Sequence, residues 1–297
     1  MHDDPPAGSQ PAGGWSSTAD ADDGQRIVDM GSLSFHIRHE VTPERCSEVF
    51  EAIAEGLPYQ HILQSDRQEA RLRQLGLIAG QQLSADGKVL AHVYRQKPGL
   101  WGDLLHFLHY TRWSPLEPTA YAFSWVYRQF THLLWEDAQI LVDDNYLKPA
   151  VGTLINAIES DPAFADVIGS KTRAGTVSLS TASLVGALNW LAALQPPVMN
   201  GKQFSRRFFC PPELMVLALG WVAQISGGEP GIDILLSPER RKALCALCLL
   251  DPAALDRSID WTLSLYSECI RPGTRAGAYG RFIRFAHWPR LDDLTST

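Results

Sequence analysis

Arginine and glutamine side chains near the start of this sequence have the types and the spacing to bind a nucleic acid. One predicted helix carries Arg67, Gln68, Arg71, Arg73 and Gln74, and Lys88 lies near the start of the next predicted helix. Arg67 and Arg71 are four residues apart, so a helix places them on one face, where they could contact phosphates. Gln68 and Gln74 could read the edges of bases. We therefore predict contact with double-stranded DNA; the alternatives are a solvated helix face and a surface that docks a protein.

A second group of arginines lies near the C-terminus and is interleaved with aromatic residues. The arginines are Arg271, Arg275, Arg281 and Arg284, and the aromatic residues are Tyr279, Phe282, Phe285 and Trp288. A basic hairpin that carries aromatic side chains is suited to contact with phosphates and with the minor groove. The alternative is that Phe282, Phe285 and Trp288 belong to a core and that the arginines pair with Asp256, Asp260 and the C-terminal acids. The sequence leaves both interpretations open.

Histidine and cysteine pairs raise the question of a metal site. Asp103, His106 and His109 would share one face of a helix and could bind a metal. The apolar residues between them favour polar positions on an amphipathic helix, because the sequence supplies no further ligand. Cys245 and Cys248 lie in an apolar helix without a matching second pair, which favours buried thiols. We therefore predict no metal and no cofactor.

The sequence lacks the motifs of common enzyme families. It holds no G-x-x-x-x-G-K-[ST] phosphate loop, no G-x-G-x-x-G after a predicted strand, no G-x-S-x-G and no H-E-x-x-H. The acidic pairs Glu136-Asp137 and Asp143-Asp144 lie at predicted helix ends, whereas a metal-dependent nuclease holds its carboxylates on rigid strands. These observations favour a protein that is not an enzyme.

The first basic group depends on an N-terminal run of helices followed by a hairpin. The predicted elements are a helix over 43–56, a break at Gly56-Leu57-Pro58, a short helical turn at Tyr59–Leu63, a helix from Ser65 to Gly76, a strand at Leu77–Ala79, a tight Asp86-Gly87 turn and a helix that begins near Lys88. The run Leu75-Gly76-Leu77-Ile78, followed by Leu83-Ser84-Ala85-Asp86-Gly87-Lys88-Val89-Leu90, resembles the winged helix-turn-helix of many bacterial proteins. The resemblance covers about a sixth of the chain and implies a recognition helix that lies in the major groove.

The last third of the chain predicts a second run of the same kind. The predicted elements are helices over 211–225, 237–250 and 253–268, a strand over 270–272, a glycine-rich hairpin over 273–280 and a strand over 281–285. Helix, turn, helix, strand, hairpin and strand is again a winged-helix order. Between the two runs, residues 88–135 predict a pair of helices that pack through aromatic side chains.

The segment Trp101–Tyr110, followed by an aromatic helix, is also distantly similar to an uncharacterised bacterial family with an N-terminal winged helix. Genes of that family sit beside DNA-modification and phage-defence genes, including those of DNA phosphorothioation. The similarity implies an accessory or regulatory component of such a system, with double-stranded DNA and further protein subunits as partners. The alternative function keeps this fold as a non-enzymatic docking scaffold in a multi-protein complex.

Charge and length place these parts in one mainly α protein. The chain has 297 residues and a formal net charge of −7. Residues 58–113 carry seven Lys and Arg against four Asp and Glu, whereas residues 1–57 carry three against 11, so positive charge gathers around the predicted recognition helix. No apolar run is long enough to span a membrane and no secretory signal is recognised, which predicts a cytoplasmic protein.

Four parts are predicted along the chain. They are a disordered acidic tail over 1–25, an N-terminal winged helix over 26–97, a helical domain over 98–198, and a C-terminal helical domain with a second winged helix over 199–297.

Overall fold

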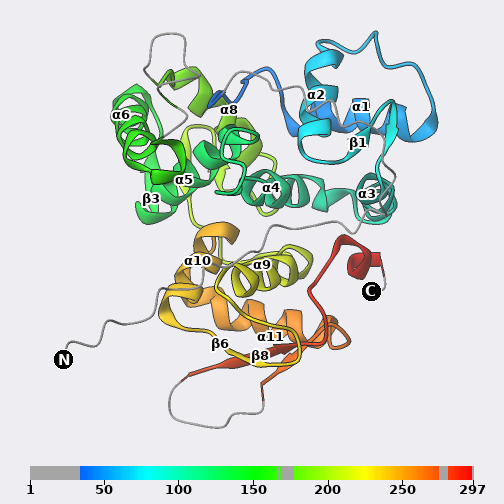
Figure 1. The fold of residues 1–297 in the computed structure, drawn as a ribbon, viewed down its shortest axis with the longest axis vertical. Coiled ribbons are helices and arrows are strands. Elements are labelled where there is room, and N and C mark those ends of the chain that lie inside the picture. The colour runs from blue at the N-terminus through cyan, green and yellow to red at the C-terminus, as the bar shows by residue number, and fades with distance from the viewer. Residues whose placement is uncertain (1–33, 166–167, 169–176, 274–279, 296–297) are drawn as a thin grey trace, which may run out of the picture.

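The computed structural model describes residues 34–165, 168, 177–273 and 280–295. Within these residues the chain is mainly helical, as predicted, and its short strands form three small antiparallel sheets (Figure 1). The predicted tail over 1–25 lies outside the described residues. Among the helices that are described, none could serve as a membrane span.

The N-terminal part of the described chain is a group of helices with one hairpin. Its elements are α1 (Pro43–Glu55), α2 (Ser65–Gln74), β1 (Ile78–Ala79), β2 (Gln82–Leu83) and α3 (Ala85–Gln96). α1 begins where the Thr42 side chain accepts a hydrogen bond from the Arg45 N–H, and it ends at Gly56, whose φ of 69° favours glycine. The buried face of α1 packs against α2, β2 and α3.

Two details of this part differ from the sequence prediction. Residues 59–63 form turns and not a helix, so only α1 and α2 precede the hairpin. Asp86 and Gly87 lie in the first turn of α3, and the chain reverses instead at Gly80, which has a φ of 59°. A Cβ atom at Gly87 would lie 2.1 Å from the Leu77 carbonyl oxygen. A close approach between backbones, and not a turn, therefore requires glycine at position 87.

The middle part is a helical layer with one small sheet. Its elements are η1 (Pro98–Leu100), α4 (Trp101–Thr111), α5 (Ala122–Glu136), β3 (Gln139–Leu141), α6 (Asp144–Ser160), η2 (Pro162–Phe164), α8 (Thr181–Leu191), β4 (Met199–Asn200) and β5 (Gln203–Ser205). β5 lies between β3 and β4. The predicted pairing of these two helices is confirmed, since α4 packs against α5 and the His109 ring of α4 meets the Phe123 ring of α5 edge-on with centroids 5.1 Å apart.

The C-terminal part combines three helices with a three-stranded sheet. Its elements are α9 (Pro212–Ile225), β6 (Asp233–Leu235), α10 (Pro238–Cys248), η3 (Pro252–Ala254), α11 (Leu255–Leu265), β7 (Ile270–Pro272), β8 (Phe282–Phe285) and η4 (Leu291–Thr295). β8 lies between β6 and β7, with Ile234 opposite Ile283. The three predicted helices and the last two strands are confirmed, whereas β6 was not predicted.

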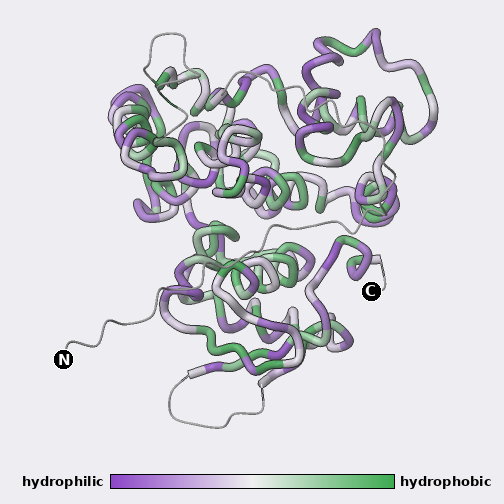
Figure 2. Tube along the Cα trace, viewed as in Figure 1, coloured by the Kyte–Doolittle hydropathy of each residue, from purple (hydrophilic) through white to green (hydrophobic). Residues whose placement is uncertain are grey.

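A buried polar network joins the middle and C-terminal parts, where α9 packs against α4 and α10 against α5 (Figure 1). Apolar colours predominate along α9 in Figure 2, and residues 212–223 of this helix are all buried. Asp103 of α4 forms an ion pair with Arg207, with 2.7 Å between Oδ1 and Nη1. The Arg207 Nε–H donates to the Cys248 carbonyl oxygen at 2.7 Å. The prediction that Cys245 and Cys248 are buried thiols is confirmed.

Candidate functional site

The face of α2 that was predicted to contact DNA is partly inside the molecule. Gln68 is fully buried, and its side chain donates to the Glu40 carbonyl oxygen at 3.0 Å. Arg71 is 5 % exposed, and its guanidinium lies 3.8 Å from the centre of the Phe123 ring. Arg71 and the buried Leu72 follow Gln68 by three and four residues, the spacings that place side chains on one face of a helix. The structure therefore does not present Gln68 and Arg71 at the surface where the predicted contact with a nucleic acid requires them.

The remaining predicted residues of this region lie nearer the surface, and two of them are paired with acids. Arg67 forms an ion pair with Glu40, and Arg73 forms one with Glu69. Gln74 and Lys88 are exposed. Residues 34–97 contain eight Lys and Arg and eight Asp and Glu, and four of these acids are exposed along α1, namely Glu44, Glu48, Glu51 and Glu55. This part of the protein does not present the basic field that a DNA backbone attracts.

Two of the three predicted C-terminal arginines that the structure describes are paired with acids. Arg281 contacts Asp260, with 2.5 Å between Nη2 and Oδ1, and Arg284 contacts Asp233, with 2.9 Å between Nε and Oδ1. Arg271 is exposed and donates from Nε to the Ser267 carbonyl oxygen. Arg275 and Tyr279 lie outside the described residues. For Arg281, the alternative interpretation of pairing with Asp256 and Asp260 is the one that holds.

The candidate metal residues of α4 are interior, contrary to the prediction of polar positions on an amphipathic helix. Asp103, His106 and His109 are all fully buried. His106 lies 2.7 Å from the Tyr127 hydroxyl through Nδ1 and 2.7 Å from the Leu247 carbonyl oxygen through Nε2. Burial lowers the pKa of His106 to about 3, so its ring is neutral. These side chains connect elements of the core and have no route to a substrate.

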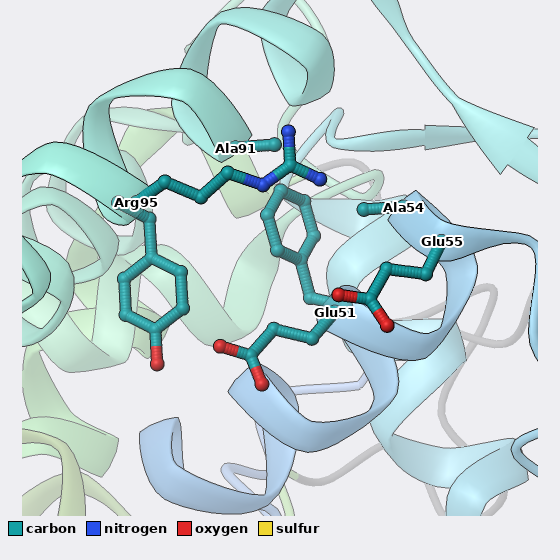
Figure 3. A pocket seen from close by; sticks show the side chains of 7 residues that line it. Glu51, Ala54, Glu55, Ala91 and Arg95 are labelled. Atoms are coloured by element: carbon teal, nitrogen blue, oxygen red, sulfur yellow. The ribbon is translucent and has the colours of Figure 1, made fainter.

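A small pocket lies between α1 and α3. Its volume is about 140 Å³, and it is lined by Phe50, Glu51, Ala54, Glu55, Ala91, Tyr94 and Arg95. Figure 3 shows Glu51 and Glu55 on the α1 side and Arg95 on the α3 side of this pocket. Ligand sites of drug-like size usually exceed ~300 Å³. The pocket is therefore suited to a single side chain or a small ion and not to a cofactor.

A larger and more apolar groove lies where the three parts meet. Its volume is about 490 Å³, and it is lined by Lys97, Gly99, Leu100, Gln195, Pro196, Phe209, Pro211, Pro212 and Glu213. Lys97 and Glu213 are the charged residues of this lining, and they pair with each other at 3.0 Å. We call this feature the Phe209 groove. Because its charges are mutually neutralised, it suits an apolar occupant and not an ionic one.

Exposed apolar side chains continue from the Phe209 groove onto α11. Phe208, Phe209, Trp261 and Leu265 are 61 %, 36 %, 46 % and 44 % exposed, and we call them the aromatic patch. The Phe209 and Trp261 rings lie 5.2 Å apart. Arg257 of α11 donates to the Phe208 carbonyl oxygen at 2.9 Å, which fixes the loop on the helix. Contiguous exposed apolar surface of this kind commonly marks a contact with another protein.

No pattern in the sequence predicts the aromatic patch. Its only sequence signals are the adjacent pair Phe208-Phe209 before two prolines and Trp261 next to Asp260 on the polar side of a helix. No protein-family model, curated protein or solved structure matches this chain. The Phe209 groove and the aromatic patch are therefore the features of the described residues that point to a function.

Proposed function

We propose that this chain is a non-enzymatic docking subunit that binds an apolar segment of a partner protein. The observation that carries the proposal is the aromatic patch beside the Phe209 groove. Aromatic side chains that border a groove supply most of the binding energy in many protein interfaces. Because Lys97 and Glu213 neutralise each other's charge at the groove, the groove favours apolar side chains of the partner protein.

The arrangement of the C-terminal part supports a winged-helix assignment for this docking unit. Its elements follow the order helix, strand, helix, helix, strand, strand, and the sheet order is β6, β8, β7. In that assignment α11 takes the place of the recognition helix. Its exposed side chains include Asp256, Asp260, Trp261 and Leu265. Asp256 and Asp260 are paired with Arg281, so the apolar side chains of Trp261 and Leu265 distinguish this face, and exposed apolar side chains suit contact with a protein surface.

DNA binding is the second candidate, because some predicted side chains remain available. Arg73, Gln74, Lys88 and Arg271 are exposed. A role beside a DNA-modification or phage-defence system fits either candidate, since such a system contains both DNA-binding and protein-binding subunits. The balance favours docking because Gln68 and Arg71 are buried and Arg281 is paired with acids.

A peptide selection tests the docking proposal and does not require the identity of the partner. A random peptide library displayed on phage is selected on the full chain and counter-selected on the Trp261→Ser variant. Peptides with apolar anchors should be enriched, and Trp261→Ala should weaken their affinity by about 10-fold or more, as for other central aromatic residues of interfaces. Leu116→Ala is the matched control, because Leu116 is a 70 % exposed apolar residue outside the patch.

Two results would overturn the proposal. One is a selection that yields no peptide dependent on Trp261. The other is tight binding of duplex DNA that falls steeply with salt and is lost when Arg73 and Arg271 are replaced by Ala, because that behaviour is the signature of phosphate contacts.

A further inference from the structure

Three potential metal ligands from separate segments meet beside the C-terminal sheet. Cys269 directly precedes β7, His287 closely follows β8, and Asp293 lies in η4. One ligand atom of each residue lies within 4.8 Å of the others. The backbone sets this arrangement, because the Ala286 N–H donates to the Cys269 carbonyl oxygen at 2.8 Å and so places His287 next to the cysteine.

Hydrogen bonds already orient two of these side chains. The His287 Nε2 atom lies 2.8 Å from the Asp293 Oδ1 atom. The other carboxylate oxygen of Asp293 accepts a hydrogen bond from the Arg290 N–H at 2.7 Å. The Arg290 contact comes from outside the cluster and is of the kind that holds a ligand in place before a metal arrives, whereas the His287–Asp293 contact joins two of the three residues to each other. The Cys269 side chain is buried, the Asp293 side chain is 22 % exposed and the His287 side chain is 52 % exposed, so the cluster has a route to solvent.

A thiolate, an imidazole and a carboxylate are each ligands that zinc accepts in proteins. Zinc–ligand bonds of about 2.0–2.3 Å in a tetrahedron place the ligand atoms about 3.3–3.8 Å apart. Small rotations of the side chains would bring the present cluster to that spacing. We propose that Cys269, His287 and Asp293 bind one Zn²⁺ ion. The fourth position takes a water molecule, and the proton of the Cys269 thiol leaves to solvent when the sulfur binds the metal.

The cluster also resembles the cysteine, histidine and acid of thiol hydrolases, but its geometry does not suit that chemistry. The Cys269 Sγ–H donates to the His287 backbone carbonyl oxygen at 3.7 Å. A nucleophilic cysteine instead shares its proton with a basic side chain and faces a substrate. Cys269 is only 3 % exposed, so no acyl group could reach it.

A metal at this position would hold the C-terminal segment against the N-terminal part of the protein. η4 buries Leu291 and Leu294 and packs against α3 of the N-terminal part (Figure 1). Zinc would tie η4 to β7 and β8 and so hold the C-terminal segment against α3. Binding to the folded state alone would also stabilise that state.

Metal analysis of the full chain, freed of any histidine tag, tests the site. The protein is loaded with ZnCl₂, dialysed against metal-free buffer at neutral pH and analysed by inductively coupled plasma mass spectrometry. We expect one zinc ion per chain. Replacement by Co²⁺ should give the intense visible bands of a tetrahedral site and a thiolate-to-cobalt charge-transfer band, because one ligand is sulfur.

Matched variants identify the ligands. Cys269→Ser, His287→Gln and Asp293→Asn should each weaken metal binding by about 100-fold or more, since loss of even an outer contact costs up to about that much. Asp292→Asn is the control, because Asp292 neighbours Asp293 but does not belong to the cluster. His287→Gln and Asp293→Asn change partly exposed side chains, so they keep the test valid if Cys269→Ser does not fold.

Three results would overturn the site. The wild-type chain could retain no zinc, the cobalt form could lack the thiolate band, or the three ligand variants could retain metal as well as Asp292→Asn does. The last result would assign the bound ion to another part of the chain.

Discussion

His106 is an enclosed imidazole whose two nitrogen atoms both have partners. Because the Leu247 carbonyl oxygen is only an acceptor, Nε2 carries the proton and Nδ1 accepts from the Tyr127 hydroxyl. His109, one turn away, lies among aromatic rings, with its ring centre 4.1 Å from that of Tyr127. Burial lowers the pKa of His109 well below its usual value, and the nearby charge of Arg71 lowers it further. Both rings are therefore neutral in the folded state.

These neutral histidines predict how stability depends on pH. An unfolded histidine has a pKa near ~6.5, whereas the pKa of folded His106 is about 3. Between these pH values the unfolded chain binds a proton at His106 that the folded chain does not bind. The free energy of unfolding therefore has its highest contribution from His106 above pH ~6.5 and decreases as the pH falls below that value. His106 alone should contribute a loss of about 1.4 kcal/mol per pH unit in this window.

The His106→Gln variant isolates this contribution. Glutamine does not titrate. The slope of the unfolding free energy against pH should therefore decrease by the equivalent of one bound proton, about 1.4 kcal/mol per pH unit. Urea unfolding followed by fluorescence at a series of acidic pH values measures the slope. His92→Gln, at an exposed position of α3, should leave it unchanged. A wild-type slope in His106→Gln would contradict the assignment of a neutral, non-titrating His106.

Individual residues also mark where sequence reasoning stops. The helix predicted from Ser65 to Gly76 is confirmed as α2, but Gln68 and Arg71 occupy the stripe that faces α1 and Phe123. No local pattern distinguishes a polar side chain that stacks in the core from one that faces water, because the partner ring is distant in sequence. Phe209 and Trp261 show the converse, since a large apolar residue gives no sign that it is exposed.

At the scale of elements, α3 depends on a glycine that its helix propensity would not favour. Gly87 sits in the first turn of α3, and a side chain there would meet the Leu77 carbonyl oxygen at 2.1 Å. Backbone of this kind cannot move aside without shifting the hairpin. Gly87→Ala should therefore destabilise the protein by about 2 kcal/mol or more, within the range for strained or overpacked positions.

Gly152 provides the matched comparison for Gly87. It lies in α6, is exposed, and has no atom within 4 Å of an added Cβ. Gly152→Ala should stabilise the protein by about 0.5–1 kcal/mol, since alanine favours the helix. Urea unfolding of both variants gives the comparison. If the two substitutions changed the free energy of unfolding equally, the close contact between α3 and the hairpin would not disfavour a side chain at position 87.

The elements that sequence predicted best are those with a period and an end signal. α9 and α10 follow apolar patterns between prolines and polar residues, and both are confirmed within a few residues. β3, β4, β5 and β6 have only two or three residues each, too few to show alternation. Their pairing comes from the arrangement of the helices, which a local pattern does not contain.

At the scale of the whole molecule, contacts between distant residues join parts that the sequence suggested as separate domains. Asp103 and Arg207 are 104 residues apart and meet inside the protein. Their side chains are 0 % and 1 % exposed, respectively. One apolar core runs through all three parts. A patch or a metal site in the C-terminal part is therefore supported by the entire chain.

Removing one partner of the Asp103–Arg207 pair tests how strongly the parts depend on it. Asp103→Leu leaves the Arg207 guanidinium buried without its acid, and we expect a loss of about 3–5 kcal/mol in the free energy of unfolding. Adding Arg207→Met removes that unpaired charge, so the double variant should recover part of the loss. Recovery should be incomplete, because the Gln195 N–H and the Cys248 carbonyl oxygen lose their partners. Urea unfolding measures the stability of both single variants and of the double variant. If the double variant lost the sum of the two single losses in unfolding free energy, Asp103 and Arg207 would not act as a unit.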